Sequence, residues 1–139
     1  MRSLAPLGPV YQAGTLSGNP VAVAAGMKTV ELLIKENPYP RLADAGAKLS
    51  AALNQLSGEF HVAQLGGVFT PFFRREPVRN LDDAKTCDTS AYAAFFRGML
   101  ERSFYLPPAQ FEAAFISAAH TDADIDAFIV AEKEVRKSM

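Results

Sequence analysis

The chain has 139 residues, of which 49% are hydrophobic, and a formal net charge of −1 at pH 7. This length supplies enough material for one domain with a hydrophobic core. The near balance of 14 basic and 15 acidic residues argues against an electrostatic nucleic-acid surface. No apolar run approaches the roughly 20 residues of a membrane span, and the N-terminus lacks the apolar core of a signal peptide. A single cysteine, Cys87, excludes an internal disulfide and indicates a reducing cytoplasm.

The first notable segment is 11–20, which is rich in small, hydroxyl and amide groups. Glycine at positions 14 and 18 allows a ligand to approach the main chain closely. Thr15 and Ser17 add hydroxyls that can donate to an anion. These groups predict a phosphate-holding turn.

A long helix is predicted directly after this turn. Asn19 is a good N-cap and Pro20 suits the first helical position. One helix face carries the apolar residues Val23, Met27, Val30 and Ile34. A turn that leads into a helix N-terminus presents unpaired N–H groups and a favourable dipole to an anion. The alternative is an ordinary capped helix start that binds nothing.

The remaining patterns predict an α+β unit in which helices pack on a small, mainly antiparallel sheet. A second helix follows Pro40, with Leu42, Leu49, Leu53 and Leu56 on one face and Gly58 at its C-terminus. Two strands, 60–65 and 68–73, are joined at Gly66-Gly67 as a hairpin. The polar residues 74–87 predict an exposed loop.

Two further helices and a strand complete the predicted unit. Asp88 caps the first of these helices, whose inner residues are Tyr92, Phe95, Phe96 and Met99. Residues 113–118 indicate a short buried strand. Thr121 and Asp124 resemble a capping box, and the final helix buries Ile125, Phe128, Ile129 and Val135. We expect residues 1–35 to be the turn with a long entry helix and 36–139 to be the α+β domain.

The reactive side chains offer few clear catalytic groups. Glu112 stands between Phe111 and an apolar run, where an acid can have a perturbed pKa; the alternative is a strand-edge glutamate that points to water. His120 and His61 lack partners for general-base work and indicate capping or packing roles. Cys87 has no metal-ligand companion, which favours an inert thiol. The acidic clusters at 82–83 and 122–126 are interpreted as solvated charges.

Three segments resemble, in the correct order, the pyridoxal-phosphate-dependent class III aminotransferases of fold type I. The first is Gly-Pro-Val-Tyr-Gln-Ala-Gly-Thr-Leu-Ser-Gly-Asn-Pro at 8–20. The second is Phe-Arg-Gly-Met-Leu-Glu-Arg-Ser at 96–103 with Tyr-Leu-Pro-Pro at 105–108. The third runs from Gln110 to Thr121 and ends in Ala-His-Thr. The resemblance covers essentially the whole chain, and the form of the turn and the Ala-His-Thr ending favour the family's aminomutases. Ala114 departs from the glycine that is frequent there.

The resemblance implies a role for each matched site residue. Gly14 and Thr15 match the pair that reaches the phosphate of the cofactor, pyridoxal 5′-phosphate, bound in the neighbouring subunit of a homodimer. Glu112 matches an acidic position near the substrate, which implies substrate handling or subunit communication. The implied reaction converts glutamate 1-semialdehyde to 5-aminolevulinate for tetrapyrrole (porphyrin) synthesis in the cytoplasm. No metal, nucleic acid or membrane is implied.

The resemblance also implies what this segment does not contain. It corresponds to the C-terminal part of the family, and the Schiff-base lysine of the cofactor lies in a sequence context upstream of Met1. None of Lys28, Lys35, Lys48, Lys85, Lys133 and Lys137 matches that context. We therefore expect no catalytic residue other than the substrate-side Glu112, and an isolated chain without activity. Two alternatives stay open, namely another class III aminotransferase and a non-catalytic dimerisation module.

Overall fold

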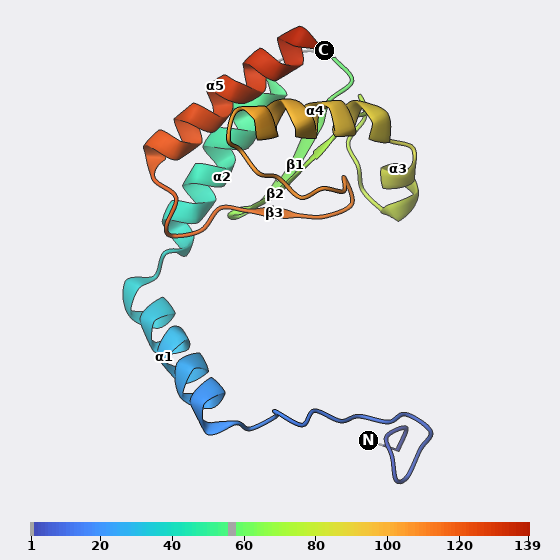
Figure 1. Cartoon of the computed structure of the whole chain (residues 1–139), viewed down its shortest axis with the longest axis vertical. Helices are drawn as coiled ribbons and strands as arrows, with labels where there is room; N and C mark the ends of the chain where they lie inside the picture. The colour runs from blue at the N-terminus through green and yellow to red at the C-terminus, as the bar shows by residue number, and fades with distance from the viewer. Residues whose placement is uncertain (1, 56–57) are drawn as a thin grey trace. The chain divides into compact units, whose positions relative to one another are not determined.

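Helices and a small antiparallel sheet alternate along the chain, as the α+β prediction requires (Figure 1). The computed structural model describes residues 2–55 and 58–139. The chain separates into two units, one that ends at Asn37 and one that begins at Pro38. The elements are α1 (Pro20–Glu36), α2 (Tyr39–Asn54), β1 (His61–Leu65), β2 (Val68–Phe72), α3 (Leu81–Lys85), α4 (Thr89–Glu101), β3 (Ala114–Phe115) and α5 (Asp122–Ser138).

The first unit consists of the N-terminal turn and α1. The predicted N-cap Asn19 and the proline at the start of α1 are both confirmed. The helix ends at Asn37, which adopts a left-handed conformation with φ of 39°. None of the residues of α1, all of which the structure describes, is buried. The predicted apolar face is therefore exposed within the unit, and 62% of Met27 is accessible to solvent.

The second unit begins with α2, which differs from its prediction at both ends. It starts at Tyr39 rather than after Pro40, because a proline is tolerated within the first turn of a helix. It ends at Asn54, before the expected Gly58, because the Asn54 side chain exchanges two hydrogen bonds with the backbone of Val62 in β1. Of the predicted apolar face, Leu49 and Leu53 are buried and Leu42 is partly buried, whereas Leu56 lies outside the described residues.

The sheet has the strand order β1-β2-β3, and all its pairs are antiparallel. Val68 pairs with Leu65 in β1 and with Phe115 in β3, so it fixes the register on both sides. The predicted hairpin is confirmed, and Gly66 turns it with φ of 58°. Helix α2 packs on β1 and β2. It approaches so closely that a Cβ on Gly46 would collide with the carbonyl oxygen of Gly66.

The prediction of an exposed loop at 74–87 holds for 74–80, which are irregular and mostly exposed, but is wrong for the residues that follow. Helix α3 forms there because the side chain of Asn80 accepts a hydrogen bond from the N–H of Asp83 at 2.9 Å and so caps it. Ala84 and Cys87, three residues apart, are buried within the second unit. The polarity of the segment concealed this short amphipathic turn.

The buried strand predicted at 113–118 is only partly correct. Strand β3 contains just Ala114 and Phe115, and the Phe115 side chain is 68% exposed. The N–H of Ile116 donates to the carbonyl of Gly67 at 2.7 Å. The chain then turns, because the N–H of His120 bonds to the carbonyl of Ser117, and this turn ends the strand.

Helices α4 and α5 complete the core as predicted. Asp88 caps α4, and Thr121 and Asp124 form the capping box of α5. Helix α5 packs against α2 and α4. The inner faces bury Tyr92, Phe95, Met99, Ile125, Phe128, Ile129 and Val135, with Phe96 partly buried.

A charged pair lies inside this core. The carboxylate of Glu132 is fully buried and pairs with Arg136 one turn further along α5. Arg136 also donates to the carbonyl of Leu53 at 2.7 Å, and its guanidinium lies 4.0 Å from the centre of the Phe60 ring. Burial raises the pKa of Glu132, and the charge of Arg136 opposes that rise. Arg136 thus ties the end of α5 to α2 and to the residue before β1.

The close approach of α2 to the hairpin predicts a specific intolerance at Gly46. Gly46→Ala should lower the free energy of unfolding by roughly 1–3 kcal/mol, because the new methyl group displaces backbone rather than a flexible side chain. Urea unfolding followed by circular dichroism measures the loss. Gly26→Ala in α1, where no atom lies near the new methyl group, is the control and should preserve or increase helicity. Equal stability of the Gly46→Ala protein and the wild type would contradict the prediction.

The buried pair predicts a pH-dependent penalty for the loss of Arg136. Arg136→Met should cost about 3–5 kcal/mol near neutral pH, because Glu132 remains buried without a partner. The folded-state pKa of Glu132 is raised, so its protonated form favours the fold, and that contribution is lost as the pH rises through the folded pKa. The penalty should therefore shrink toward acid pH.

Chemical denaturation of the wild type and the Arg136→Met protein, from neutral to acid pH, measures how the penalty changes. Lys28→Met is the control, because its partner Glu31 is exposed and such surface pairs contribute less than about 1 kcal/mol. A penalty that does not change with pH would rule out the stated cause.

Candidate functional site

The predicted phosphate-holding turn forms two overlapping hydrogen-bonded turns before α1. The N–H of Ser17 donates to the carbonyl of Gly14 at 3.0 Å, and that of Asn19 donates to Leu16 at 3.1 Å. Gly18 has φ of 76°, a left-handed conformation that favours glycine. A Cβ on Gly14 would collide with the Ser17 hydroxyl, so glycine leaves space for that hydroxyl over the backbone.

In the first turn of α1, all of whose residues the structure describes, no backbone N–H is without a partner. Pro20 has no N–H to donate. The N–H groups of Val21 and Ala22 donate to the side-chain oxygen of Asn19, each at 3.1 Å. The N–H of Val23 donates to the Asn19 carbonyl at 2.9 Å. The expectation of unpaired donors at the helix N-terminus is therefore wrong, because the cap occupies them.

The donors that remain precede the cap. Within the described residues, the N–H groups of Gly14 and Thr15 and the hydroxyl of Thr15 make no hydrogen bond. Both residues are exposed. Adjacent N–H groups and a hydroxyl are the donors that a phosphate oxygen accepts. The turn therefore fits a phosphate group through Gly14 and Thr15 rather than through the helix end.

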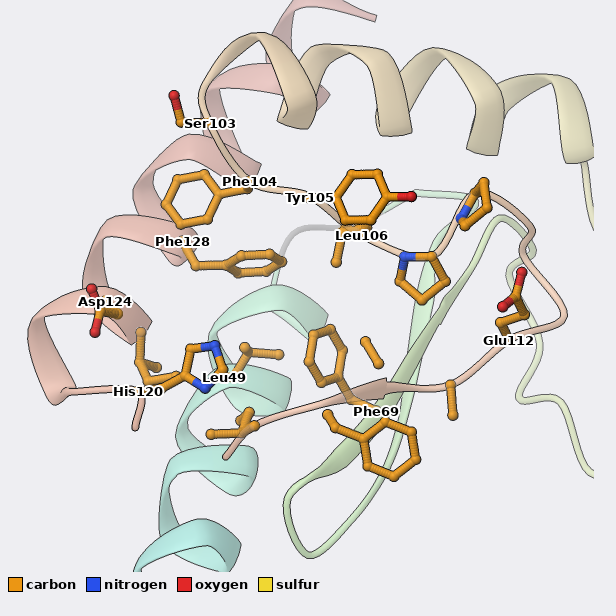
Figure 2. A pocket seen from close by; sticks show the side chains of 17 residues that line it. Leu49, Phe69, Ser103, Phe104, Tyr105, Leu106, Glu112, His120, Asp124 and Phe128 are labelled. Carbon is orange, nitrogen blue, oxygen red and sulfur yellow. The ribbon is translucent and has the colours of Figure 1, made fainter. Parts of the chain in front are cut away.

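The second candidate, Glu112, lies at the edge of a cavity of about 610 Å³ in the second unit. Figure 2 shows the aromatic side chains of Phe104 and Phe128 along this cavity, with Glu112 at one end and His120 and Asp124 at the other. Glu112 is exposed. Of the two interpretations of Glu112, the structure supports a glutamate that faces water and not an acid enclosed by apolar side chains.

A buried tyrosine of α4 holds the segment that leads to Glu112. The hydroxyl of Tyr92 donates to the carbonyl of Pro107 at 2.6 Å. Only 3% of Tyr92 is exposed. Burial, and secondarily the negative charge of Glu112, raise the pKa of Tyr92 to about 12. The tyrosine therefore stays a neutral donor at any physiological pH.

The sheet holds the same segment from the other side. Gln110 is 2% exposed, and its side-chain oxygen accepts from the N–H of Phe73 at 3.4 Å. The hydroxyl of Thr70 donates to the Glu112 carbonyl at 3.4 Å. No sequence motif marks Tyr92 or Gln110 as residues of this site. Their only signal in the sequence is a polar side chain close to an apolar helix or to the Pro-Pro pair at 107–108. The hydrogen bonds that give them their role join positions far apart in the sequence, which a local pattern does not show.

The two histidines have structural environments. His120 is exposed, and its Nδ1 accepts from the N–H of Ser117 at 3.0 Å. His120 thus stabilises the turn before α5, whereas the cap of that helix is Thr121. His61 is partly buried in β1. Neither histidine has a carboxylate hydrogen-bond partner among the described residues.

The thiol and most of the acidic residues match their structural interpretations, but Asp83 does not, because it is partly buried and bonds to Arg74 and to the N–H of Arg79. Cys87 is buried, and burial raises the pKa of its thiol, which makes it a poor nucleophile. Asp82, Asp122 and Asp126 are exposed. No cluster that could hold a metal ion occurs in residues 2–55 and 58–139, and no helix of this part of the chain is long and apolar enough to cross a bilayer.

Sequence comparison places the chain among known enzymes. It is 46% identical over 143 residues to the glutamate-1-semialdehyde 2,1-aminomutase of Desulfitobacterium hafniense (strain DSM 10664 / DCB-2), covering 100% of this chain and 33% of that protein. It is 49% identical over 132 residues to the enzyme of the same name from Thermus thermophilus, covering 91% of this chain and 31% of that protein. The chain belongs to this family. It spans about a third of the length of these relatives and matches their C-terminal part.

Solved structures confirm the fold. A β-phenylalanine aminotransferase from Variovorax paradoxus superposes with a TM-score of 0.77 at 24% identity, covering 94% of this chain and 31% of that chain. An ω-transaminase from Sphaerobacter thermophilus gives a TM-score of 0.72 at 20% identity, covering 96% of this chain and 32% of that chain. The chain thus matches the C-terminal domain of the fold type I aminotransferases. No model of a protein family matches the chain.

The family relationship implies dependence on pyridoxal phosphate for the parent enzymes. Within the described residues, Gly14 and Thr15 have exposed donors without a partner that suit a phosphate group.

Proposed function

We propose that the chain acts as the C-terminal part of a glutamate-1-semialdehyde 2,1-aminomutase. The proposed reaction transfers the amino group of glutamate 1-semialdehyde from C2 to C1 and yields 5-aminolevulinate, a precursor of tetrapyrroles, in the cytoplasm. The observation that carries the proposal is the identity of 46% with such an enzyme over the whole of this chain. Class III transaminases share the fold, but the aminomutases share the sequence as well.

In the proposed enzyme, Gly14 and Thr15 hold the phosphate of pyridoxal phosphate bound by the neighbouring subunit of a homodimer. Bound pyridoxal phosphate supplies an electron sink for chemistry at the amino-bearing carbon. The contribution of this chain is to bind and orient. The free N–H groups and the Thr15 hydroxyl support this role, because they are exposed and have no partner among the described residues.

Glu112 is proposed to act at the substrate end of the site. An exposed carboxylate at the rim of a cavity is able to accept hydrogen bonds from an ammonium or hydroxyl group of the substrate. Its backbone is tied to β2 through Thr70. The apolar face of α1, exposed within its own unit, is proposed to pack against the rest of the enzyme.

A second candidate function is a non-catalytic dimerisation module. The exposed apolar residues of α1, which include Val23, Met27 and Val30, favour it. Static light scattering on the purified chain tests this alternative, and a monomer at all concentrations excludes it.

The isolated chain is predicted to form no covalent complex with pyridoxal phosphate. None of its lysines lies in the sequence context of the family's catalytic lysine, so no positioned amine is present. Absorption spectra of the chain with micromolar pyridoxal phosphate should therefore lack the band of a lysine-bound cofactor. The full-length D. hafniense enzyme is the positive control. A stoichiometric band from this chain would overturn the prediction.

A chimera tests the proposed function directly. In it, this chain replaces the matched 143 residues of the D. hafniense enzyme, and we expect it to form 5-aminolevulinate from glutamate 1-semialdehyde. Thr15→Val should weaken its affinity for pyridoxal phosphate about ten- to a hundredfold, the effect of one hydrogen bond to a charged group. Titration of the apoenzyme measures this loss.

Thr89→Val is the matched control for the chimera, because Thr89 is an exposed threonine at the start of α4. The equivalent replacement in the S. thermophilus ω-transaminase separates the two enzyme classes and should not support its activity. An inactive aminomutase chimera, or equal cofactor affinity of the two threonine variants, would count against the proposal.

A further inference from the structure

The segment 107–112 has no regular secondary structure, yet it is fixed at both ends by buried side chains. At its start, the Tyr92 hydroxyl of α4 donates to the Pro107 carbonyl at 2.6 Å. Near its end, Gln110 reaches back into the core and accepts from the N–H of Phe73. Both anchoring side chains are almost completely buried, so water does not compete for these hydrogen bonds.

The two anchors share one neighbour. The ring of Tyr92 lies edge-on to that of Phe73 with centroids 6.4 Å apart, and Gln110 binds the backbone N–H of the same Phe73. The segment between Pro107 and Gln110 is therefore attached twice to one place in the core. A shift of either anchor moves the next residues, among them Glu112, whose N–H bonds to the carbonyl of Ala109 at 3.2 Å.

The chemistry of Gln110 indicates more than packing. Its side-chain nitrogen is buried and has no hydrogen-bond partner within the described residues. A buried donor without a partner lowers stability, so an apolar side chain of similar size would serve packing better. The useful group of Gln110 is its oxygen, which fixes the backbone.

We propose that Tyr92 and Gln110 are positioning residues that fix segment 107–112 and so determine where the Glu112 carboxylate stands at the rim of the cavity. The proposal rests on the function proposed for Glu112. Neither residue contacts the cofactor or substrate; each acts through the backbone that carries Glu112. The charge of Glu112 is among the causes of the raised Tyr92 pKa, which agrees with their proximity.

The first experiment measures the anchor in the chain itself. Tyr92→Phe removes only the hydroxyl. Amide hydrogen exchange at Glu112 should accelerate about five- to tenfold, the change that one buried hydrogen bond of typical strength produces. Tyr39→Phe, the same change at an exposed tyrosine at the start of α2, should leave exchange at Glu112 unchanged. Unchanged exchange in the Tyr92→Phe chain would overturn the proposal.

The second experiment measures the consequence in the aminomutase chimera, through a double-mutant cycle. Tyr92→Phe should lower kcat/KM about tenfold when Glu112 is present. It should have little further effect in the Glu112→Gln background, because the positioned carboxylate is already absent. Gln110→Met should give the same pattern. A purely structural role predicts an equal loss in both backgrounds, and that result would refute the positioning role.

The two proposals fail in distinguishable ways. An inactive wild-type chimera overturns the proposed function and with it the catalytic part of this inference. An active chimera with additive losses preserves the proposed function and overturns only the inference.

Discussion

The second unit depends on the position of one aromatic residue, Phe73, at the end of β2. Its carbonyl accepts the N–H of Asp88, the N-cap of α4, at 3.0 Å, and its N–H donates to Gln110. Its ring meets those of Phe60, Tyr92 and Phe95. The start of a helix, the approach to β1 and the segment before Glu112 therefore share one fixed point. Because that point is buried, a displacement of any of these elements disturbs the others.

The features that are set by residues close together in the sequence are predicted correctly. The N-cap at Asn19, the cap at Asp88 and the capping box of Thr121 with Asp124 are each set by hydrogen bonds within a few residues. The hairpin at Gly66 belongs to the same class, since a left-handed turn between apolar runs needs glycine. These signals also explain why the fold class was predicted correctly from one sequence.

Distant contacts decide the features that the sequence does not predict. Glu132 and Arg136 have the spacing of a surface ion pair, and only the packing of α5 on α2 and Phe60 places them inside the core. Tyr92 was predicted to be buried, but its bond to Pro107 spans a loop whose path the sequence does not specify. Helix α3 was missed because its buried residues are few. Local sequence patterns do not show which buried polar groups, far apart in the sequence, form hydrogen bonds with each other.

The corrected geometry at the N-terminal turn changes how its motif should bind an anion. A bare helix N-terminus attracts phosphate through its dipole and its N–H groups, whatever side chains precede it. Here the side chain and carbonyl of Asn19 take those N–H groups, so the donors left without a partner, among them those of Gly14 and Thr15, lie in the turn before the cap. In the proposed site, recognition therefore depends on the Thr15 hydroxyl and on a residue without a Cβ beside Ser17. The motif is informative because of these side-chain identities, and a generic capped helix would not need them.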